Sequence, residues 1–330
     1  MRIIDEQFRT GPFHREALLT AGYSEKVLRG RRFRRLFPRV WVHVDHEMTE
    51  ADWIAAARLA MPSDARVTGA TRLRQLGIDV PAERLQFVVG RDLHLDLDGI
   101  DLHRTDRLPP CTAEGVSPAA AYVELCRYAT VMAAIRIGDE LLHQEHMTLL
   151  ELRELVTTES WREGAAQARW VSRYLDPRSA SPQESTCRAR IVFAGLPWPV
   201  ANLELRADGV VVAILDLAFP RWNAAAEYEG GHHQTERSQY LRDITRFADL
   251  RDLDIEYVQI TKELARRPIS MVVAIHTMLV RCGYDGPAPS FGATWRQLQE
   301  PIPTAVAGPT RRSSGEPASV WRRDRVRNGR

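Results

Sequence analysis

Apolar residues recur along this chain with two periods, one typical of helices and one typical of strands. Residues 15–22 predict a short helix that ends at a glycine, and residues 24–28 predict a second helix with a serine N-cap. A basic segment and an apolar, strand-like run to Val44 follow. The order of two helices, a basic segment and a β element predicts a winged-helix-like module over residues 1–48.

Helical and strand patterns alternate between residues 49 and 176. Residues 86–90 predict a strand, and residues 93–103 alternate around Asp98-Gly99, which predicts a hairpin. Helical patterns cover residues 51–60, 68–77, 117–127 and 135–143, and a further helix begins at the Thr148–Glu151 capping box. We therefore expect a middle α/β domain over residues 49–176, ended by the break at Asp176-Pro177.

Residues 177–285 predict a mixed sheet with flanking helices. A helix begins at Ser181, and two strands over 200–205 and 210–219 are joined through Asp208-Gly209. A turn at 220–223 leads into another strand, and a strand over 255–261 and an apolar helix over 268–282 complete the pattern.

Acidic residues occupy two of these apolar strands, where a charge is costly to bury. Asp216 lies in the first strand, and Glu227 and Glu229 lie in the second. Side chains alternate across a strand, so the two glutamates share a face, and antiparallel pairing around the 220–223 turn brings Asp216 near that face. Converging carboxylates repel one another and lose hydration. Mg²⁺ (or Mn²⁺), held by one or two carboxylates and by substrate phosphate oxygens, compensates, so we expect a phosphodiester-cleaving site.

The run around these acids also carries a family resemblance. Asp216-Leu-Ala-Phe-Pro and the later Ala-Glu-Tyr-Glu-Gly-Gly-His-His resemble the PD-(D/E)xK-type nuclease domain of unknown function related to very-short-patch mismatch-repair endonucleases. The resemblance covers about residues 179–261 and implies a restriction-endonuclease-like fold. By it, Asp216 and Glu227 hold the metal, Glu184 is a helix-borne acid, and His233 follows the acidic strand. Such relatives usually carry Asp at the position of Glu229, and no lysine occupies the last motif position here.

Two of these residues have a second interpretation. Glu184 stands three residues after Ser181, the spacing of a capping box in which the glutamate accepts the N-cap amide. The spacing favours the cap and the resemblance favours the catalytic role. His233 could act as a general acid or base near a metal, although a histidine pair after two glycines is also an ordinary exposed turn.

Positive charge concentrates in three segments. No acid lies between Lys26 and Arg39, and a phosphate-binding surface is expected there, contacting DNA. A helical pattern over 234–251 sets Arg242 and Arg246 one turn apart, where they contact either the DNA backbone or neighbouring acids. Residues 286–330 predict a disordered basic tail. The cations of the first segment are Lys26, Arg29, Arg31, Arg32, Arg34, Arg35 and Arg39.

Composition sets the remaining limits. With 330 residues, 44% hydrophobic and 27% charged, the chain matches an ordinary globular protein of two or three domains. Its four cysteines lack zinc spacing and predict reduced thiols of a cytosolic protein. No apolar run approaches membrane length, so we expect a cytoplasmic protein without a membrane partner.

The N-terminal segment resembles a module of actinobacterial proteins near the abortive-infection type IV antitoxin family, and residues 49–176 resemble the middle domain that accompanies it. That resemblance implies DNA binding and a toxin-like protein partner. The sequence therefore leaves two functions open for this three-domain α+β protein. One is a Mg²⁺-dependent DNA endonuclease, and the other is a catalytically inactive, antitoxin-type DNA-binding transcriptional regulator.

Overall fold

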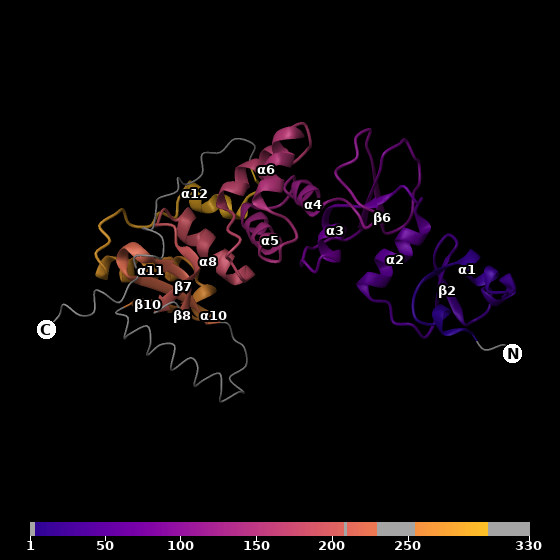
Figure 1. The fold of residues 1–330 in the computed structure, drawn as a ribbon, viewed down its shortest axis with the longest axis horizontal. Coiled ribbons are helices and arrows are strands. Elements are labelled where there is room, and N and C mark those ends of the chain that lie inside the picture. Colours follow the sequence, from indigo (N-terminus) through magenta and orange to yellow (C-terminus); the bar gives the residue numbers. More distant parts are fainter. Residues whose placement is uncertain (1–3, 208–209, 230–254, 303–330) are drawn as a thin grey trace, which may run out of the picture. The chain divides into compact units, whose positions relative to one another are not determined.

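The computed structural model describes residues 4–207, 210–229 and 255–302, and these form an α+β protein with three separate sheets (Figure 1). The chain divides into two compact units, residues 1–125 and 126–330. The division falls inside the expected middle domain of residues 49–176. Each unit is described by itself.

The first sheet of unit 1 holds the basic segment. Its strand order is β1-β3-β2, with β1 Phe13–His14, β2 Phe33–Phe37 and β3 Val40–His43 all paired antiparallel. Aromatic residues build the core beneath it, because Phe8, Phe13 and Phe33 are buried in edge-to-face contact. The short helices here are η1 Glu6–Phe8, α1 Arg15–Thr20 and η2 Glu25–Val27.

Of the two helices predicted near the N-terminus, one forms as an α-helix and the other forms as a single 3₁₀ turn. The first is confirmed as α1, and the chain turns after it at Gly22, whose φ of 79° suits a glycine. The second is only the single 3₁₀ turn η2, although Ser24 does accept the Lys26 N–H as its cap. After this turn the chain enters β2, where Phe33 and Phe37 are buried and two cations of the basic segment, Arg34 and Arg35, lie on the strand.

The rest of unit 1 is a second, smaller sheet with helices. Strands β4 Arg66–Val67, β5 Leu85–Val89 and β6 Ile100–Arg104 lie in that order, and β6 runs parallel to β5. The predicted hairpin over 93–103 is therefore wrong. The Asp98-Gly99 turn forms, but Leu97 and Ile100 bury against Phe87 instead of extending into a paired first strand. The helices are α2 Glu50–Ala60, α3 Gly69–Gln75 and α4 Pro118–Leu125.

Unit 2 begins with a group of helices. The first is α5 Val131–His143, capped by Thr130, and the predicted capping box of Thr148 and Glu151 is confirmed. The helices that follow α5 are α6 Leu149–Thr158, α7 Ala165–Val171, η3 Ser172–Tyr174 and α8 Pro182–Phe193. A buried ion pair between Asp139 and Arg188 joins α5 to α8 at 2.5 Å.

The four-stranded sheet of unit 2 has the order β10-β9-β8-β7. Its strands β7 Val200–Ala207, β8 Val210–Phe219 and β9 Ala224–Tyr228 are antiparallel neighbours, whereas β10 Glu256–Ile260 runs parallel to β9. The predicted strands over 200–205, 210–219 and 255–261 are confirmed. After β10 come α10 Lys262–Ala265, α11 Pro268–Arg281, α12 Ala293–Arg296 and η5 Gln297–Gln299.

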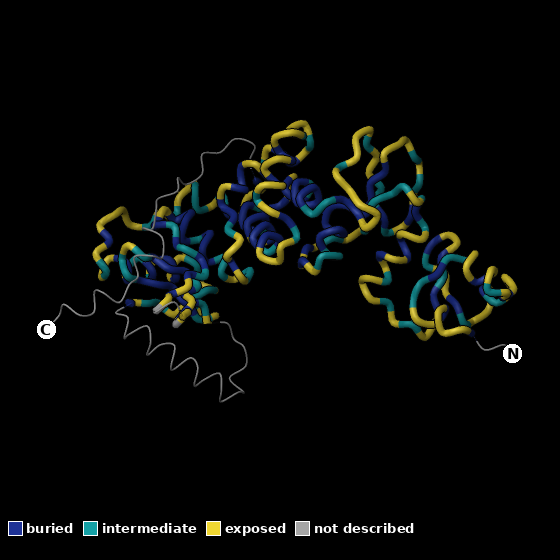
Figure 2. Tube along the Cα trace, viewed as in Figure 1, coloured by how far each residue is buried: buried dark blue, intermediate teal, exposed yellow. Residues whose placement is uncertain are grey.

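Helices α8 and α11 cover the same face of this sheet. Cys187 of α8 and Met271 of α11 are buried together with Leu217 of β8 and Ala226 of β9 (Figure 2). The apolar helix predicted over 268–282 is therefore confirmed as α11, with Gly283 at a φ of 88° just past its end. This packing fixes β8 and β9, the strands that carry the predicted acids. None of the described helices combines the length and apolar character needed to cross a membrane.

Candidate functional site

Asp216 and Glu227 meet where the pairing of β8 and β9 ends. The last paired residues are Leu217 and Ala226, so the two acids are the next residue on each strand. Each carboxylate then takes the place of a ladder carbonyl. The Asp216 N–H donates to Glu227 Oε1 at 3.2 Å, and the Tyr228 N–H donates to Asp216 Oδ2 at 2.8 Å. The predicted convergence of these two acids is confirmed.

The two acids differ in their exposure to solvent. Glu227 is only 4% exposed, whereas Asp216 is half-buried. Two neighbouring carboxylates with little hydration repel each other unless a cation or a proton intervenes. A pair of carboxylates from adjacent strands is also the donor set that Mg²⁺ commonly takes from a protein, the rest coming from water and substrate phosphate. An oxygen that accepts one backbone N–H keeps lone pairs for a metal, so the residues present fit Mg²⁺.

Glu184 lies at the N-terminus of α8 and does cap it. Its own N–H donates to Ser181 Oγ at 3.2 Å, and its carboxylate accepts from Ser181 Oγ and from the Ala180 N–H. The same carboxylate accepts a 2.6 Å hydrogen bond from the Asn202 side-chain amide. The predicted capping box therefore forms only in part, because Glu184 accepts the Ala180 N–H instead of the amide of the N-cap Ser181, and the same carboxylate contacts β7.

Asn202 connects this cap to the acid pair. It lies on β7 between the pairs Ala201–Leu217 and Leu203–Leu215, at the same level as Asp216 on β8. Its φ of 44° is left-handed, which breaks the regular strand and lets its amide reach Glu184 Oε2 and the Arg178 carbonyl, both at 2.6 Å. Nothing in the sequence marks this residue except a polar side chain in an apolar strand.

The role of Asn202 can be measured directly. Asn202→Gly loses the amide but keeps easy access to a positive φ, whereas Asn202→Ala loses both. We expect the alanine variant to be less stable than the glycine variant by about 0.5–1 kcal/mol. Urea denaturation of both full-length variants gives this difference, and equal stabilities would show that the backbone conformation of Asn202 stores no strain.

Glu184 and Asp216 both exert an electrostatic effect on the thiol of Cys187. The pKa of this thiol is raised to about 12, mainly by burial, with Arg190 opposing the rise and the negative charges of Glu184 and Asp216 adding to it. The thiol is therefore protonated and inert at neutral pH. It belongs to the packing of α8 and not to the chemistry of the site.

The remaining predicted residues of the acidic site are placed as follows. Glu229 lies just past β9, where its N–H donates to the Ile260 carbonyl at 3.0 Å while its side chain is exposed. His233, together with Arg242 and Arg246, lies outside the described residues. Within the described ranges, no group of three or more His, Cys, Asp or Glu side chains has the geometry to hold a metal ion. The structure thus brings two of the predicted acids to neighbouring positions on β8 and β9, and places Glu184 in contact with Asn202, which lies at the level of Asp216.

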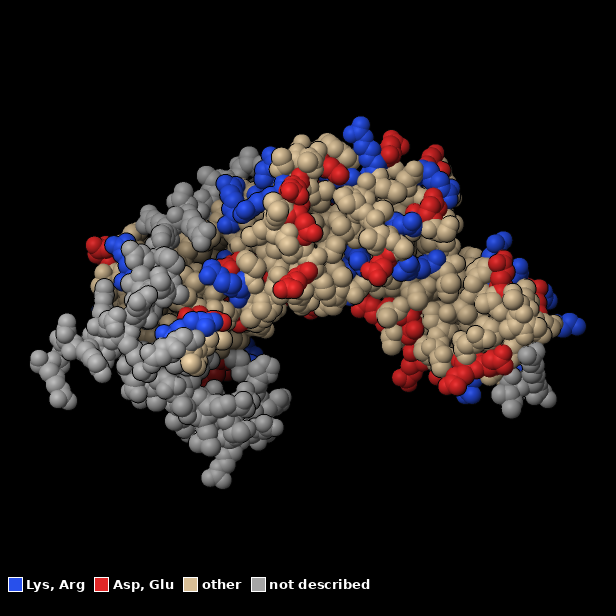
Figure 3. Space-filling view, viewed as in Figure 1, with Lys and Arg blue, Asp and Glu red and all other residues tan. Residues whose placement is uncertain are grey.

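The basic segment of unit 1 presents most of its cations to solvent. Arg34 and Arg35 are both exposed on β2, where a register shift interrupts the alternation, and Arg32 is half-buried. The other exposed cations are Lys26, Arg29, Arg31 and Arg39. None of these six exposed cations is ion-paired with an acid of the described residues. On the face drawn in Figure 3, cations and acids are interspersed over unit 1.

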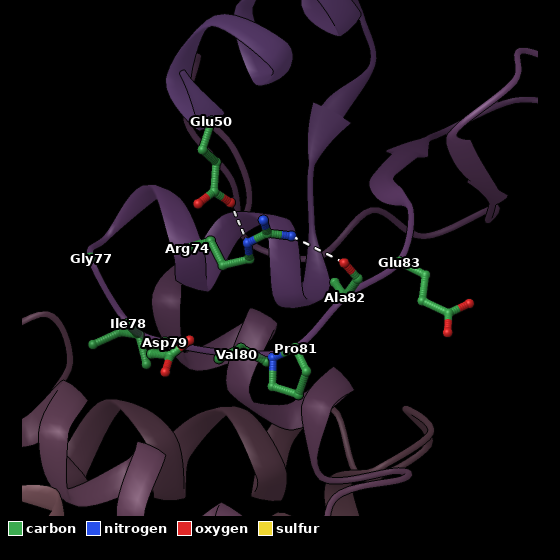
Figure 4. A pocket seen from close by; sticks show the side chains of 9 residues that line it. All are labelled: Glu50, Arg74, Gly77, Ile78, Asp79, Val80, Pro81, Ala82 and Glu83. Carbon is green, nitrogen blue, oxygen red and sulfur yellow. Dashed lines mark hydrogen bonds and ion pairs between the residues drawn. The ribbon is translucent and has the colours of Figure 1, made fainter. Parts of the chain in front are cut away.

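A cavity of about 570 Å³ in unit 1 is lined by Glu50, Arg74 and the loop from Gly77 to Glu83 (Figure 4). Its only cation, Arg74, is ion-paired with Glu50 and donates to the Ala82 carbonyl at 3.3 Å. The one cation of the lining is therefore already compensated, and Asp79 and Glu83 leave the lining acidic.

Comparison with known proteins identifies relatives but no characterised one. Uncharacterized protein Rv2248 of Mycobacterium tuberculosis strain ATCC 25618 / H37Rv and uncharacterized protein MT2308 of strain CDC 1551 / Oshkosh are each 30% identical over 188 residues. That region is 57% of this chain and 67% of each relative. No family model matches the chain, and no solved structure matches it. At this identity and coverage, the chain belongs to the same protein family as these two mycobacterial proteins.

Proposed function

We propose that the protein binds DNA and that its C-terminal part is a Mg²⁺-dependent endonuclease that hydrolyses phosphodiester bonds. One observation carries the proposal. Asp216 and Glu227 lie side by side on β8 and β9, each accepting a backbone N–H from the other strand. Carboxylates in that position cost free energy in an apolar sheet, and a bound divalent cation offsets the cost.

The order of elements around the pair supports the same proposal. A helix (α8) precedes three antiparallel strands, a fourth strand (β10) runs parallel to β9, and α11 packs on the same face as α8. This succession is compatible with the restriction-endonuclease-like fold that the sequence resemblance implies. Glu184 has a position compatible with an auxiliary acid, since its carboxylate is tied through Asn202 to the level of Asp216.

In this mechanism Asp216 and Glu227 hold the metal. With these two residues as ligands, Mg²⁺ would supply Lewis-acid chemistry at the phosphate and a more acidic water as nucleophile. The chain contributes the fixed position of the two carboxylates, because the hydrogen bonds from Asp216 and Tyr228 N–H groups orient both side chains before substrate arrives. The burial of Glu227 keeps water away from one side of the pair.

The decisive test is nicking of supercoiled plasmid in Mg²⁺ or Mn²⁺, with wild type beside Asp216→Asn. Metal-dependent nicking that is lost in the variant supports the endonuclease. DNA binding without nicking by the wild type supports the second candidate, a catalytically inactive regulator of antitoxin type that works with a toxin-like partner. Two features of the sequence favour that alternative. Glu229 stands where relatives of this kind usually carry Asp, and no lysine occupies the last motif position.

The DNA-binding half of the proposal places the basic segment on the phosphate backbone, in a module of winged-helix type. We expect the double variant Arg34→Gln/Arg35→Gln to bind all DNA sequences more weakly, because interactions with phosphates carry no sequence information. The slope of log affinity against log salt should fall by about one for each phosphate that the variant no longer neutralises. Anisotropy of a labelled duplex over a salt series in EDTA measures both quantities.

Arg91→Gln is the matched control for that experiment. Arg91 is also an exposed arginine of unit 1, but its guanidinium binds both carboxylate oxygens of Asp64, at 2.7 and 3.2 Å. Its loss should leave the salt slope unchanged. If the double variant has the same salt slope as Arg91→Gln, Arg34 and Arg35 do not contact DNA phosphates and the proposed role of the basic segment is wrong.

A further inference from the structure

A second cavity, of about 470 Å³, lies within unit 2 where α5, α8, β9 and α10 meet. Every formally charged residue that lines it is a cation: Arg136 of α5, Arg190 of α8, and Lys262 and Arg266 at the two ends of α10. Like charges gathered around one cavity raise its potential and attract anions. We call it the basic pocket.

Few acids offset the charge of the basic pocket. None of the four cations is ion-paired with an acid of the described residues. Glu263 lies within electrostatic reach of Arg266 and Lys262, and Glu184 and Asp216 act on the lining residue Cys187. Hydrogen bonds to its own backbone and to Thr261, together with the charges of Arg266 and Lys262, lower the pKa of Glu263, so it is ionised at neutral pH. Since no acid is among its lining residues, the wall of the pocket itself carries only positive formal charge.

Arg190 shows that this charge is partly withdrawn from water. The side chain is half-buried, and its Nη1 donates to the Ala265 carbonyl at 2.8 Å. Burial, opposed by Cys187, lowers the pKa of Arg190. Among the described residues the hydrogen-bond partner of this guanidinium is a carbonyl, and a guanidinium that has lost hydration is stabilised when an anion binds beside it.

The basic pocket shares a wall with the acid pair. Tyr228 lines it, follows Glu227 in β9, and donates its N–H to Asp216. Cys187 also lines it and lies within the electrostatic influence of Glu184 and Asp216. The basic pocket therefore borders α8 and β9, next to the strands that carry the two carboxylates proposed to hold metal.

We propose that the basic pocket binds a phosphate group and, resting on the proposed function, that this group is a backbone phosphate of nucleic acid whose neighbour reaches Asp216 and Glu227. Phosphate is the anion that suits this lining. Arginine offers it two parallel N–H donors, lysine adds a mobile charge, and the lining Gln183 carries a neutral amide donor.

The test compares two consecutive arginines in the full-length protein. Arg266 lines the basic pocket and Arg267 does not, although both are exposed. We expect Arg266→Gln to weaken binding of inorganic pyrophosphate about tenfold, the scale of one charge-assisted hydrogen bond, and Arg267→Gln to leave it unchanged. Lys262→Gln serves as a second pocket variant, and calorimetric titration gives the affinities. Thermal unfolding confirms that the variants are folded.

A labelled DNA duplex then distinguishes the source of the phosphate. The salt slope of duplex binding should fall by about one in Arg266→Gln and stay constant in Arg267→Gln. All titrations contain EDTA, so they do not depend on cleavage, and a failed nicking assay leaves them interpretable. Equal pyrophosphate affinities in wild type and both pocket variants would overturn the phosphate site. Weaker pyrophosphate binding with an unchanged salt slope would overturn the nucleic-acid assignment in favour of a small phosphorylated molecule.

Discussion

Replacing Glu227 by glutamine, or Asp216 by asparagine, is expected to abolish metal-dependent DNA cleavage while the protein stays folded. Each amide keeps an oxygen that can accept the backbone N–H now bound by the carboxylate, so the β8–β9 junction is retained. Each amide also removes one negative charge from the metal. We expect a loss of about 10³-fold or more, since a bound metal contributes several kcal/mol to the transition state.

Glu229→Gln is the internal control for these two variants. Glu229 is the first residue after β9, and its side chain is exposed to solvent. If Asp216 and Glu227 alone hold the metal, Glu229→Gln should retain most of the cleavage activity. Plasmid nicking and metal affinity, the latter by calorimetry, are to be measured on all three variants. Cleavage that survives in both Asp216→Asn and Glu227→Gln would place the chemistry elsewhere in the chain.

The regulator alternative gives a different result with the same proteins. An inactive domain binds DNA equally well with or without the two carboxylates. It should even become more stable in Asp216→Asn, because removing one of two neighbouring buried charges relieves repulsion. A more stable variant with unaltered DNA affinity, from a wild type that never cleaves, supports the antitoxin-type function.

The acid pair could be predicted because it depends on local rules. A turn at 220–223 joins two strands, and alternation then fixes which residues face each other, so Asp216 falls opposite Glu227 once Leu217 pairs with Ala226. The same rules failed for residues 93–103. There the local turn signal at Asp98-Gly99 is correct, but burial of Ile100 in the parallel pairing with β5 decides the partner.

Other features of the site depend on interactions that a sequence pattern does not contain. Asn202 reaches Glu184 only because its backbone adopts a left-handed φ inside a strand. The basic pocket gathers cations from three distant segments, at Arg136, Arg190 and Lys262, and each of them alone is an ordinary helix residue. Such sites are created by tertiary packing, which hydrophobic periodicity does not determine.

Replacing Arg188 by methionine is expected to cause the largest loss of stability among single substitutions considered for unit 2. Asp139 is fully buried on α5 and accepts a 2.5 Å hydrogen bond from Arg188 Nη2 and a 2.8 Å bond from the Asp176 N–H. Arg188 also donates to the Tyr174 carbonyl. Its removal leaves a buried carboxylate without its counter-charge, which costs about 3–5 kcal/mol. Urea denaturation of the full-length protein gives the change in unfolding free energy.

Two further variants separate the buried charge from lost packing. Arg127→Met removes an exposed ion pair with Glu163 and should cost no more than about 1 kcal/mol. The double variant Asp139→Asn/Arg188→Met removes the stranded charge while keeping an acceptor for the Asp176 N–H. It should therefore recover a large part of the stability lost in Arg188→Met.

The pH dependence of the Arg188→Met penalty provides the sharpest test of this ion pair. Burial is the largest influence on Asp139 and raises its pKa, and Arg188 is the main opposing influence. A raised folded-state pKa means that the folded protein favours the protonated carboxyl. Its contribution to stability is thus complete below the ordinary Asp value of 3.8 and is lost as pH rises through the folded-state pKa. Removing Arg188 raises that pKa further, so the penalty should shrink as pH falls from about 8 to about 5. A penalty that is constant over this range would show that Arg188 stabilises unit 2 by packing and neutral hydrogen bonds rather than by compensating Asp139.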